Sequence, residues 1–200
     1  MMNFISKVRP VFDISYHSYS ELVIYPLGCS PERTSNKAVV EKIGKELAKK
    51  LDYTPGTAWE LLYNADGGDI DWMYDEYQVI PYVIELNSRR QGFHPRYNKW
   101  RDKTVERNRV GWQHLLRRLS KSGVRGILTA NGVAVSNYNV EVFDTKNRVL
   151  LSNYKGHESG YFHLILNPGE YELVFKSNHS IIKTEIIEIE ENLRELNIKL

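Results

Sequence analysis

The sequence predicts an α/β protein that continues into an all-β sandwich. Between residues 37 and 51, apolar side chains recur every four positions, which is the spacing of an amphipathic helix. Residues 79–86 form a short apolar run that is typical of a strand. From about Gly123 the apolar spacing falls to two, and turn signals separate short runs without a helical pattern.

Composition limits the protein classes that remain open. The chain has 200 residues with 42% hydrophobic content, enough for one or two domains with a buried core. A formal net charge of +2 is too small to indicate a nucleic acid or membrane partner. The single cysteine, Cys29, excludes an internal disulfide framework. We therefore expect no nucleic acid partner, and no apolar run is long enough for a membrane span.

The first elements are predicted from their apolar runs and stop signals. Phe4–Pro10 resembles the end of a helix that Pro10 stops. Val11–Ser15 follows as a short strand, with His17 just past its C-terminal end, the edge where open α/β sheets bind ligands. Glu21–Tyr25 is a second short apolar piece, and the helix over Lys37–Leu51 could be capped by the residue at 35 or 36.

The middle of the chain is predicted to contain the clearest strand and a long helix. Ala58–Leu62 is ambiguous, and residues 64–69 form a turn cluster. Val79–Leu86 is the clearest strand, in which Pro81 predicts a bulge or an unpaired side. A long helix is expected over residues 100–119, with these apolar residues on one side and Gly123 as its stop: Val105, Trp112, Leu115, Leu116 and Leu119.

The tail is predicted to be a separate β domain. Turn signals lie at residues 131–132, 146–147, 156 and 167–169, and alternating apolar residues between them predict short strands. We place the domain boundary within Ser120–Val124, giving domains over residues 1–122 and 123–200.

One series of residues suggests chemistry. Glu85 lies in an apolar run, and a buried carboxylate is costly unless it is paired or used. The series starts with His-Ser-Tyr-Ser at 17–20 and continues with a tyrosine, Tyr63, before the Gly-Gly-Asp-Ile-Asp-Trp run of 67–72. Glu85-Leu86 and Gly92-Phe93 then follow before the closing helix. In this order and spacing the series resembles the C-terminal half of a zinc carboxypeptidase catalytic domain of the carboxypeptidase A/E type.

The resemblance implies a metal-dependent peptidase acting on peptide or protein C-termini. It makes His17 the third ligand of a single zinc ion and Glu85 the general base that takes a proton from the zinc-bound water. Tyr63 would close over the terminal carboxylate, and Ile70 would line the pocket for the C-terminal side chain. Tyr19 of the His-Ser-Tyr-Ser motif is also assigned to substrate binding.

The tail carries a second resemblance. Gly126-Ile127-Leu128 and the Pro-Gly-Glu-Tyr run at 168–171 are similar to the transthyretin-like, or carboxypeptidase-regulatory-like, sandwich that follows the catalytic domain in the carboxypeptidase E/N/D branch. Family members of this kind are mostly secreted or periplasmic. Residues 1–7 lack the apolar core of a signal peptide, so the sequence itself leaves the compartment unknown.

The family's other two zinc ligands form a His-x-x-Glu motif, and none of the six histidines here has a glutamate three residues later. The resemblance therefore implies that two ligands lie upstream, in an N-terminal part of the catalytic domain that this chain lacks. We expect a longer parent protein to be the active carboxypeptidase and this chain alone to be inactive, because one imidazole cannot hold catalytic zinc.

Two questions stay open at this stage. Ile70 predicts a preference for apolar or aromatic C-terminal residues, whereas the adjacent Asp69 and the sandwich-bearing branch favour basic ones. The alternative function is a non-catalytic peptidase-fold scaffold with a basic surface. That surface would use the following run: Arg89, Arg90, Arg96, Lys99, Arg101, Lys103, Arg107, Arg109, Arg117, Arg118, Lys121 and Arg125.

Overall fold

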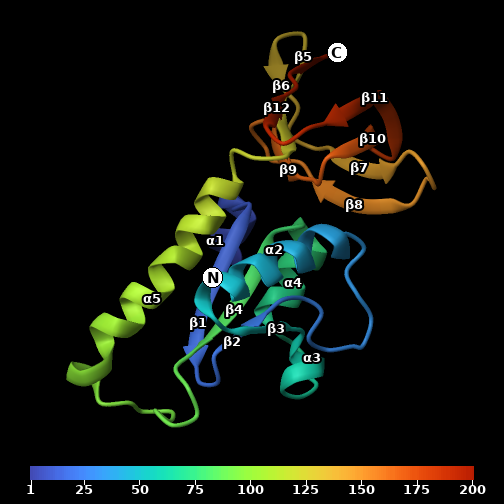
Figure 1. Cartoon of the computed structure of the whole chain (residues 1–200). Coiled ribbons are helices and arrows are strands. Elements are labelled where there is room, and N and C mark those ends of the chain that lie inside the picture. The colour runs from blue at the N-terminus through green and yellow to red at the C-terminus, as the bar shows by residue number, and fades with distance from the viewer. The chain divides into compact units, whose positions relative to one another are not determined.

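The computed structural model describes residues 1–200 and divides into two compact units (Figure 1). The sheet unit comprises Phe12–Asp75 and Val79–Arg117, and the sandwich unit comprises Met1–Val11, Glu76–Gln78 and Arg118–Leu200. The division of the chain into domains over residues 1–122 and 123–200 stays a prediction. In the structure, the first eleven residues and Glu76–Gln78 group with the C-terminal strands.

A mixed four-stranded sheet forms the centre of the sheet unit, in the order β1-β4-β2-β3. β1 (Phe12–Ser18) runs parallel to β4 (Ile80–Leu86), β2 (Leu22–Ile24) runs antiparallel to β4, and β3 (Thr54–Gly56) runs parallel to β2. The sequence predicted that His17 lies just past the end of the first strand. In the structure His17 lies inside β1, because the strand continues three residues further than predicted.

The proline of β4 lies in the part of the strand that pairs with β1 but not with β2. Pro81 faces Asp13 of β1, whereas the pairing of β4 with β2 extends only from Val83 to Glu85. A residue without an N–H group is tolerated there because β2 presents no partner at that position.

Helix α2 (Lys37–Leu51) covers the sheet with the predicted apolar residues. It packs tightly at Gly44, where an added Cβ atom would lie 2.6 Å from the Tyr25 ring and 3.1 Å from the Tyr82 ring. The Tyr82 hydroxyl donates a hydrogen bond of 2.9 Å to the Val40 carbonyl oxygen. A glycine at this position lets the helix lie directly on two tyrosine rings.

Two short helices follow α2 along the chain. α3 (Ala58–Leu61) resolves the ambiguous segment, and a capping box stabilises its start, in which Thr57 and Glu60 each bind the other's backbone N–H. α4 (Asp69–Tyr77) was not predicted. Its buried residues Ile70, Met73 and Tyr74 have the three- and four-residue spacing of a helix face.

The long helix α5 (Tyr97–Arg118) forms as predicted, but its predicted apolar side is wrong. Val105, Trp112 and Leu116 are exposed, and of the predicted set only Leu115 is buried. The helix approaches α2 at Gly111, where a Cβ atom would lie 3.1 Å from Leu47. Close packing against α2 favours a small residue over a large apolar one, so the face with fewer apolar residues is the buried one.

The sandwich unit contains a short N-terminal helix, α1 (Met2–Val8), and strands from Gly123 onward. One sheet has the order β11-β10-β7-β8, and in the other β5 pairs with β6, β9, β12 and β13. The strands are β5 (Gly123–Ala130), β6 (Val133–Ala134), β7 (Asn139–Asp144), β8 (Leu150–Lys155), β9 (Tyr161–Ile165), β10 (Gly169–Ser177), β11 (Ser180–Ile189), β12 (Leu193–Glu195) and β13 (Ile198–Lys199).

Side chains from both sheets form one core in the sandwich unit. Val140, Leu173 and Phe175 come from the first sheet, and Val124 and Phe162 come from the second. All are fully buried, so the two sheets pack face to face as a β-sandwich. None of the helices of the chain is both long and apolar enough to cross a membrane.

We expect the stability of the sandwich unit to fall on acidification because of His163. Burial, followed by the positive charge of Arg125, lowers the pKa of His163 from 6.5 to about 4. The unfolded chain therefore binds a proton that the folded state does not, and stability is lost as the pH falls through that interval, by up to about 3 kcal/mol.

Hydrogen exchange of the core amides of β5 and β9, measured between neutral pH and pH 4, tests this loss. A His163→Gln variant should lose most of the pH dependence, whereas an exposed His94→Gln variant should keep it. Identical pH profiles for wild type and His163→Gln would contradict the expectation.

Gly126 is a second position on which the sandwich unit depends. A Cβ atom there would lie 1.8 Å from the carbonyl oxygen of Leu196. Because a backbone atom cannot be displaced cheaply, we expect Gly126→Ala to destabilise the unit by about 3 kcal/mol. Urea denaturation measures the effect, and Ile127→Ala, at the exposed neighbouring position, should change stability by less than about 1 kcal/mol.

Candidate functional site

The parallel pairing of β1 and β4 brings His17 and Glu85 together. The two residues are direct partners in the register, so their side chains leave the sheet on the same face. Both lie one residue before the end of their strand. An imidazole and a carboxylate are thereby held side by side at one edge of the sheet.

A pocket of about 130 Å³ lies on this face and is built entirely within the sheet unit. His17 and Glu85 line it together with Tyr63 and Ile70, which come from the segments after α3 and at the start of α4. Ile70 is 5% exposed and contributes an apolar surface, whereas Tyr63 is 68% exposed. Four of the five residues that the sequence singled out therefore line one pocket.

Glu85 is held in an unusual electrostatic setting. The residue is 9% exposed, and its Oε2 atom is buried without a hydrogen-bond partner. Burial raises the pKa of this carboxyl group, and the nearby His17 lowers it in part. A carboxyl group with a raised pKa and an unused oxygen is suited to accept a proton from a neighbouring molecule.

Small residues form another part of the pocket wall. A Cβ atom on Gly28 would lie 3.2 Å from the Cβ of Ala58 and 3.5 Å from that of Ala65, and all three residues line the pocket. The loop before α2 and the turn after α3 therefore meet without large side chains between them. The sequence analysis did not identify this wall.

Asp71 accepts hydrogen bonds from the loop that contains Gly28 and Cys29. The Gly28 N–H donates to both carboxylate oxygens of Asp71 at 3.0 Å, and the Cys29 N–H donates to Oδ2 at 3.1 Å. The same carboxylate, through a hydrogen bond to the thiol, raises the pKa of Cys29. Asp71 also lies in the first turn of α4, where a negative charge is favourable.

Tyr19 does not line this pocket. Its ring packs edge-on against Phe93, with 6.4 Å between centroids, and the Ser18 hydroxyl donates to the Phe93 carbonyl oxygen at 3.5 Å. The end of β1, with the residue that follows it, and the loop after β4 thus contact each other. Any role of Tyr19 in binding stays a prediction.

The structure contains no group of three or more His, Cys, Asp or Glu side chains placed to hold a metal ion. His17 is the one histidine among the pocket residues, and the buried, unpartnered Oε2 of Glu85 shares its pocket. These two groups fit part of a zinc peptidase site, namely one nitrogen ligand and the base beside it.

Comparisons with known proteins identify the family of this chain. Residues 1–109 match the zinc carboxypeptidase family, more than half of the chain. The chain belongs to this family.

Individual relatives cover less of the chain. It is 36% identical over 83 residues to a zinc carboxypeptidase from Simulium vittatum, covering 38% of this chain and 27% of the relative. It is 34% identical over 87 residues to carboxypeptidase A1 from Sus scrofa, covering 40% of this chain and 21% of the relative. The chain therefore spans about a quarter or less of the length of these relatives.

Among solved structures, the chain is similar to thrombin activatable fibrinolysis inhibitor. The two are 26% identical with a TM-score of 0.48, over 52% of this chain and 28% of that chain.

Replacing Glu85 by its neutral isostere should stabilise the sheet unit. At pH 7 the buried carboxylate costs free energy that Gln would not cost, so we expect Glu85→Gln to raise the free energy of unfolding by about 1 kcal/mol. Urea denaturation at pH 7 measures the change. The exposed Glu32→Gln variant serves as the control and should be neutral, and a destabilised Glu85→Gln variant would contradict the expectation.

Removing the charge of Asp71 should have the opposite effect. Asp71→Asn keeps the shape but weakens three charge-assisted hydrogen bonds to the loop, so we expect a loss of about 2 kcal/mol. Asp75→Asn, at an exposed position of the same helix, is the matched control. Hydrogen exchange of the Gly28 and Cys29 amides reports the loop directly, and unchanged protection in Asp71→Asn would refute the assignment.

Proposed function

We propose that this chain is part of a zinc-dependent carboxypeptidase that removes single C-terminal residues from peptides or proteins. The observation that carries the proposal is the pairing of His17 with Glu85 across β1 and β4, at a pocket that Tyr63 and Ile70 also line. Family membership supports the same reaction class.

In the proposed mechanism, His17 is one of three zinc ligands. A bound zinc ion would polarise a water molecule and the scissile carbonyl group, lowering the pKa of the water. Glu85 would accept a proton from the attacking water at its Oε2 atom and donate it to the amine nitrogen that leaves as the peptide bond breaks. Its burial supports this role, because a raised pKa brings the carboxyl group closer to the pKa of the group it deprotonates.

Three residues are proposed to bind the substrate. Ile70 contacts the C-terminal side chain, and Tyr63, which is largely exposed at the pocket, closes over the terminal carboxylate. Tyr19 contacts the chain further from the terminus, which is supported by its position against Phe93 beside the pocket. The apolar Ile70 favours apolar or aromatic C-terminal residues over basic ones.

We further propose that a segment outside this chain supplies two zinc ligands, and that the chain by itself is inactive. β1 is the outermost strand of its sheet and carries His17, so its free edge can pair with a further strand. The sandwich unit is proposed to be a transthyretin-like domain without catalytic residues, and the parent protein to be secreted or periplasmic. Tight stoichiometric zinc binding together with peptide hydrolysis by the 200-residue chain would contradict the inactivity.

The scaffold alternative receives less support from the basic residues. Arg107 of the sheet unit binds Glu21 and the Leu51 carbonyl oxygen, and in the sandwich unit Arg118 is buried against the carbonyl oxygens of Ser122 and Leu166. Arg125 is paired with Glu195. Several members of the basic run are thus engaged internally instead of forming one free surface.

The decisive test uses the parent protein purified from its source. Glu85→Gln should lower kcat/KM for a C-terminal peptide bond by at least about 100-fold, because it removes the general base. Glu32→Gln should retain full activity. Activity of Glu85→Gln within a few-fold of wild type would refute the role of Glu85.

The preference for the C-terminal residue is tested on the same protein. We expect peptides ending in Phe to be hydrolysed with higher kcat/KM than peptides ending in Arg, and Ile70→Asp to reverse the order by pairing a carboxylate with the basic side chain. Faster hydrolysis of the Arg peptide by the wild type would show that Asp69, which also lines the pocket, sets the preference instead.

A further inference from the structure

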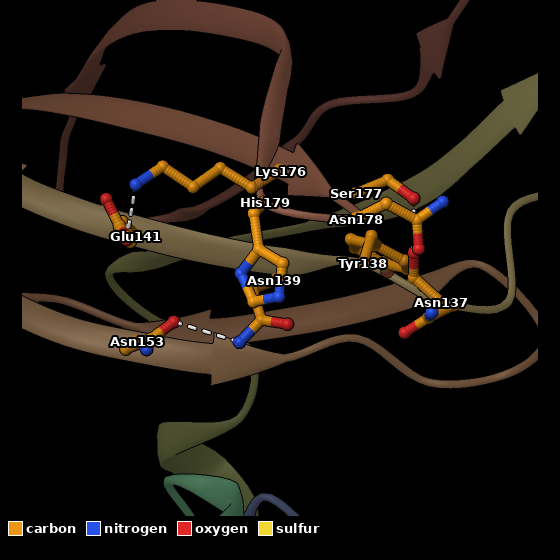
Figure 2. A pocket seen from close by; sticks show the side chains of 9 residues that line it. All are labelled: Asn137, Tyr138, Asn139, Glu141, Asn153, Lys176, Ser177, Asn178 and His179. Atoms are coloured by element: carbon orange, nitrogen blue, oxygen red, sulfur yellow. Dashed lines mark hydrogen bonds and ion pairs between the residues drawn. The ribbon is translucent and has the colours of Figure 1, made fainter.

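A second pocket, of about 360 Å³, lies within the sandwich unit (Figure 2). It is formed by β7, β8, and the end of β10 with the turn that follows, and its lining consists almost entirely of polar side chains. The peptidase proposal uses none of these residues.

Strand register explains why polar side chains gather here. Asn139 and Glu141 alternate with the buried Val140 and Val142, so they project from the outer face of the sheet. Lys176 of β10 is the direct partner of Asn139.

On the other side of β7, Asn153 of β8 is the partner of Glu141. Four polar side chains from three adjacent strands therefore form one array.

The four side chains of the array form one ion pair and one hydrogen bond with each other. The Lys176 ammonium donates to Glu141 at 2.7 Å, so the two charges offset each other. The side-chain Nδ2 of Asn139 donates to the side-chain Oδ1 of Asn153 at 3.1 Å. This bond leaves Oδ1 of Asn139 as an acceptor and Nδ2 of Asn153 as a donor for a ligand.

The β10–β11 turn contributes the imidazole of His179 to the lining of the same pocket. Asn178 and His179 both have positive φ angles, 48° and 63°, as a two-residue hairpin turn of type I′ requires. His179 occupies a position that favours glycine, so its side chain is kept there at a conformational cost. The pairing of β10 with β11 also shifts register between Phe175 and Lys176, next to the pocket, where such irregularities re-aim side chains.

We propose that this pocket binds one sugar unit of a neutral glycan. Each sugar hydroxyl is both a donor and an acceptor, which matches the free amide groups of Asn139 and Asn153 at one position. The internally paired Lys176 and Glu141 do not favour a charged ligand, and the exposed His179 contributes a flat ring to the lining. An extended peptide would instead pair with the free edge of β8, whereas this pocket lies on the face of the sheet.

Nuclear magnetic resonance of the ¹⁵N-labelled full chain tests the proposal. The protein is titrated separately with glucose, galactose, mannose and N-acetylglucosamine, and the side-chain amide signals of Asn139 and Asn153 are followed. We expect at least one sugar to give saturable shifts of these signals. Asn139→Ala and Asn153→Ala should each weaken that binding at least tenfold. Asn147→Ala, in the exposed β7–β8 turn, should leave it unchanged.

Three results would overturn the proposal. The first is the absence of saturable shifts with all four sugars. The second is unchanged affinity in both Asn139→Ala and Asn153→Ala. The third is that an acetylated, amidated tripeptide or inorganic phosphate produces the same shifts and displaces the sugar, which would assign the pocket to a peptide or an anion. None of these results depends on whether the parent protein is a peptidase.

Discussion

The parallel register of β1 against β4 is the constraint on which the candidate site depends. A slip of one residue would move the partner of His17 away from Glu85 and turn one of the two side chains to the opposite face of the sheet. The packing of α2 on Tyr25 and Tyr82, with Gly44 at the contact, holds the neighbouring strands β2 and β4 in place. Packing on one face of the sheet thereby contributes to the geometry at the strand ends.

The elements that a single sequence pattern specifies could be predicted from the sequence. The bounds of α2 follow from its four-residue apolar spacing, and β4 follows from a single apolar run. In the sandwich unit, the turns at residues 131–132, 146–147 and 167–169 separate strands as their Asn, Gly and Pro residues indicate. The gathering of His17, Tyr63, Ile70 and Glu85 in one pocket was inferred from a family resemblance and not from the patterns themselves.

The remaining features depend on contacts that a sequence pattern does not contain. The apolar residues of α5 predicted the wrong buried face because its contact with α2 is made through Gly111. α4 was overlooked because its start coincides with a Gly-Gly turn, although Ile70, Met73 and Tyr74 carried the helical spacing. The hydrogen bonds between Asp71 and the loop at Gly28 join residues far apart in the chain, and the polar pocket of the sandwich unit arises from cross-strand register.

The size of the pocket depends on other residues than its ionisable groups, because Gly28, Ala58 and Ala65 form part of its wall. Its free volume depends on three residues that carry no side-chain atoms beyond Cβ, whereas His17 and Glu85 lie on the strands. A larger residue in the wall would narrow the pocket and leave the strand pair in place. Substitutions at these three positions can thus change the size of molecule that the pocket admits without replacing His17 or Glu85.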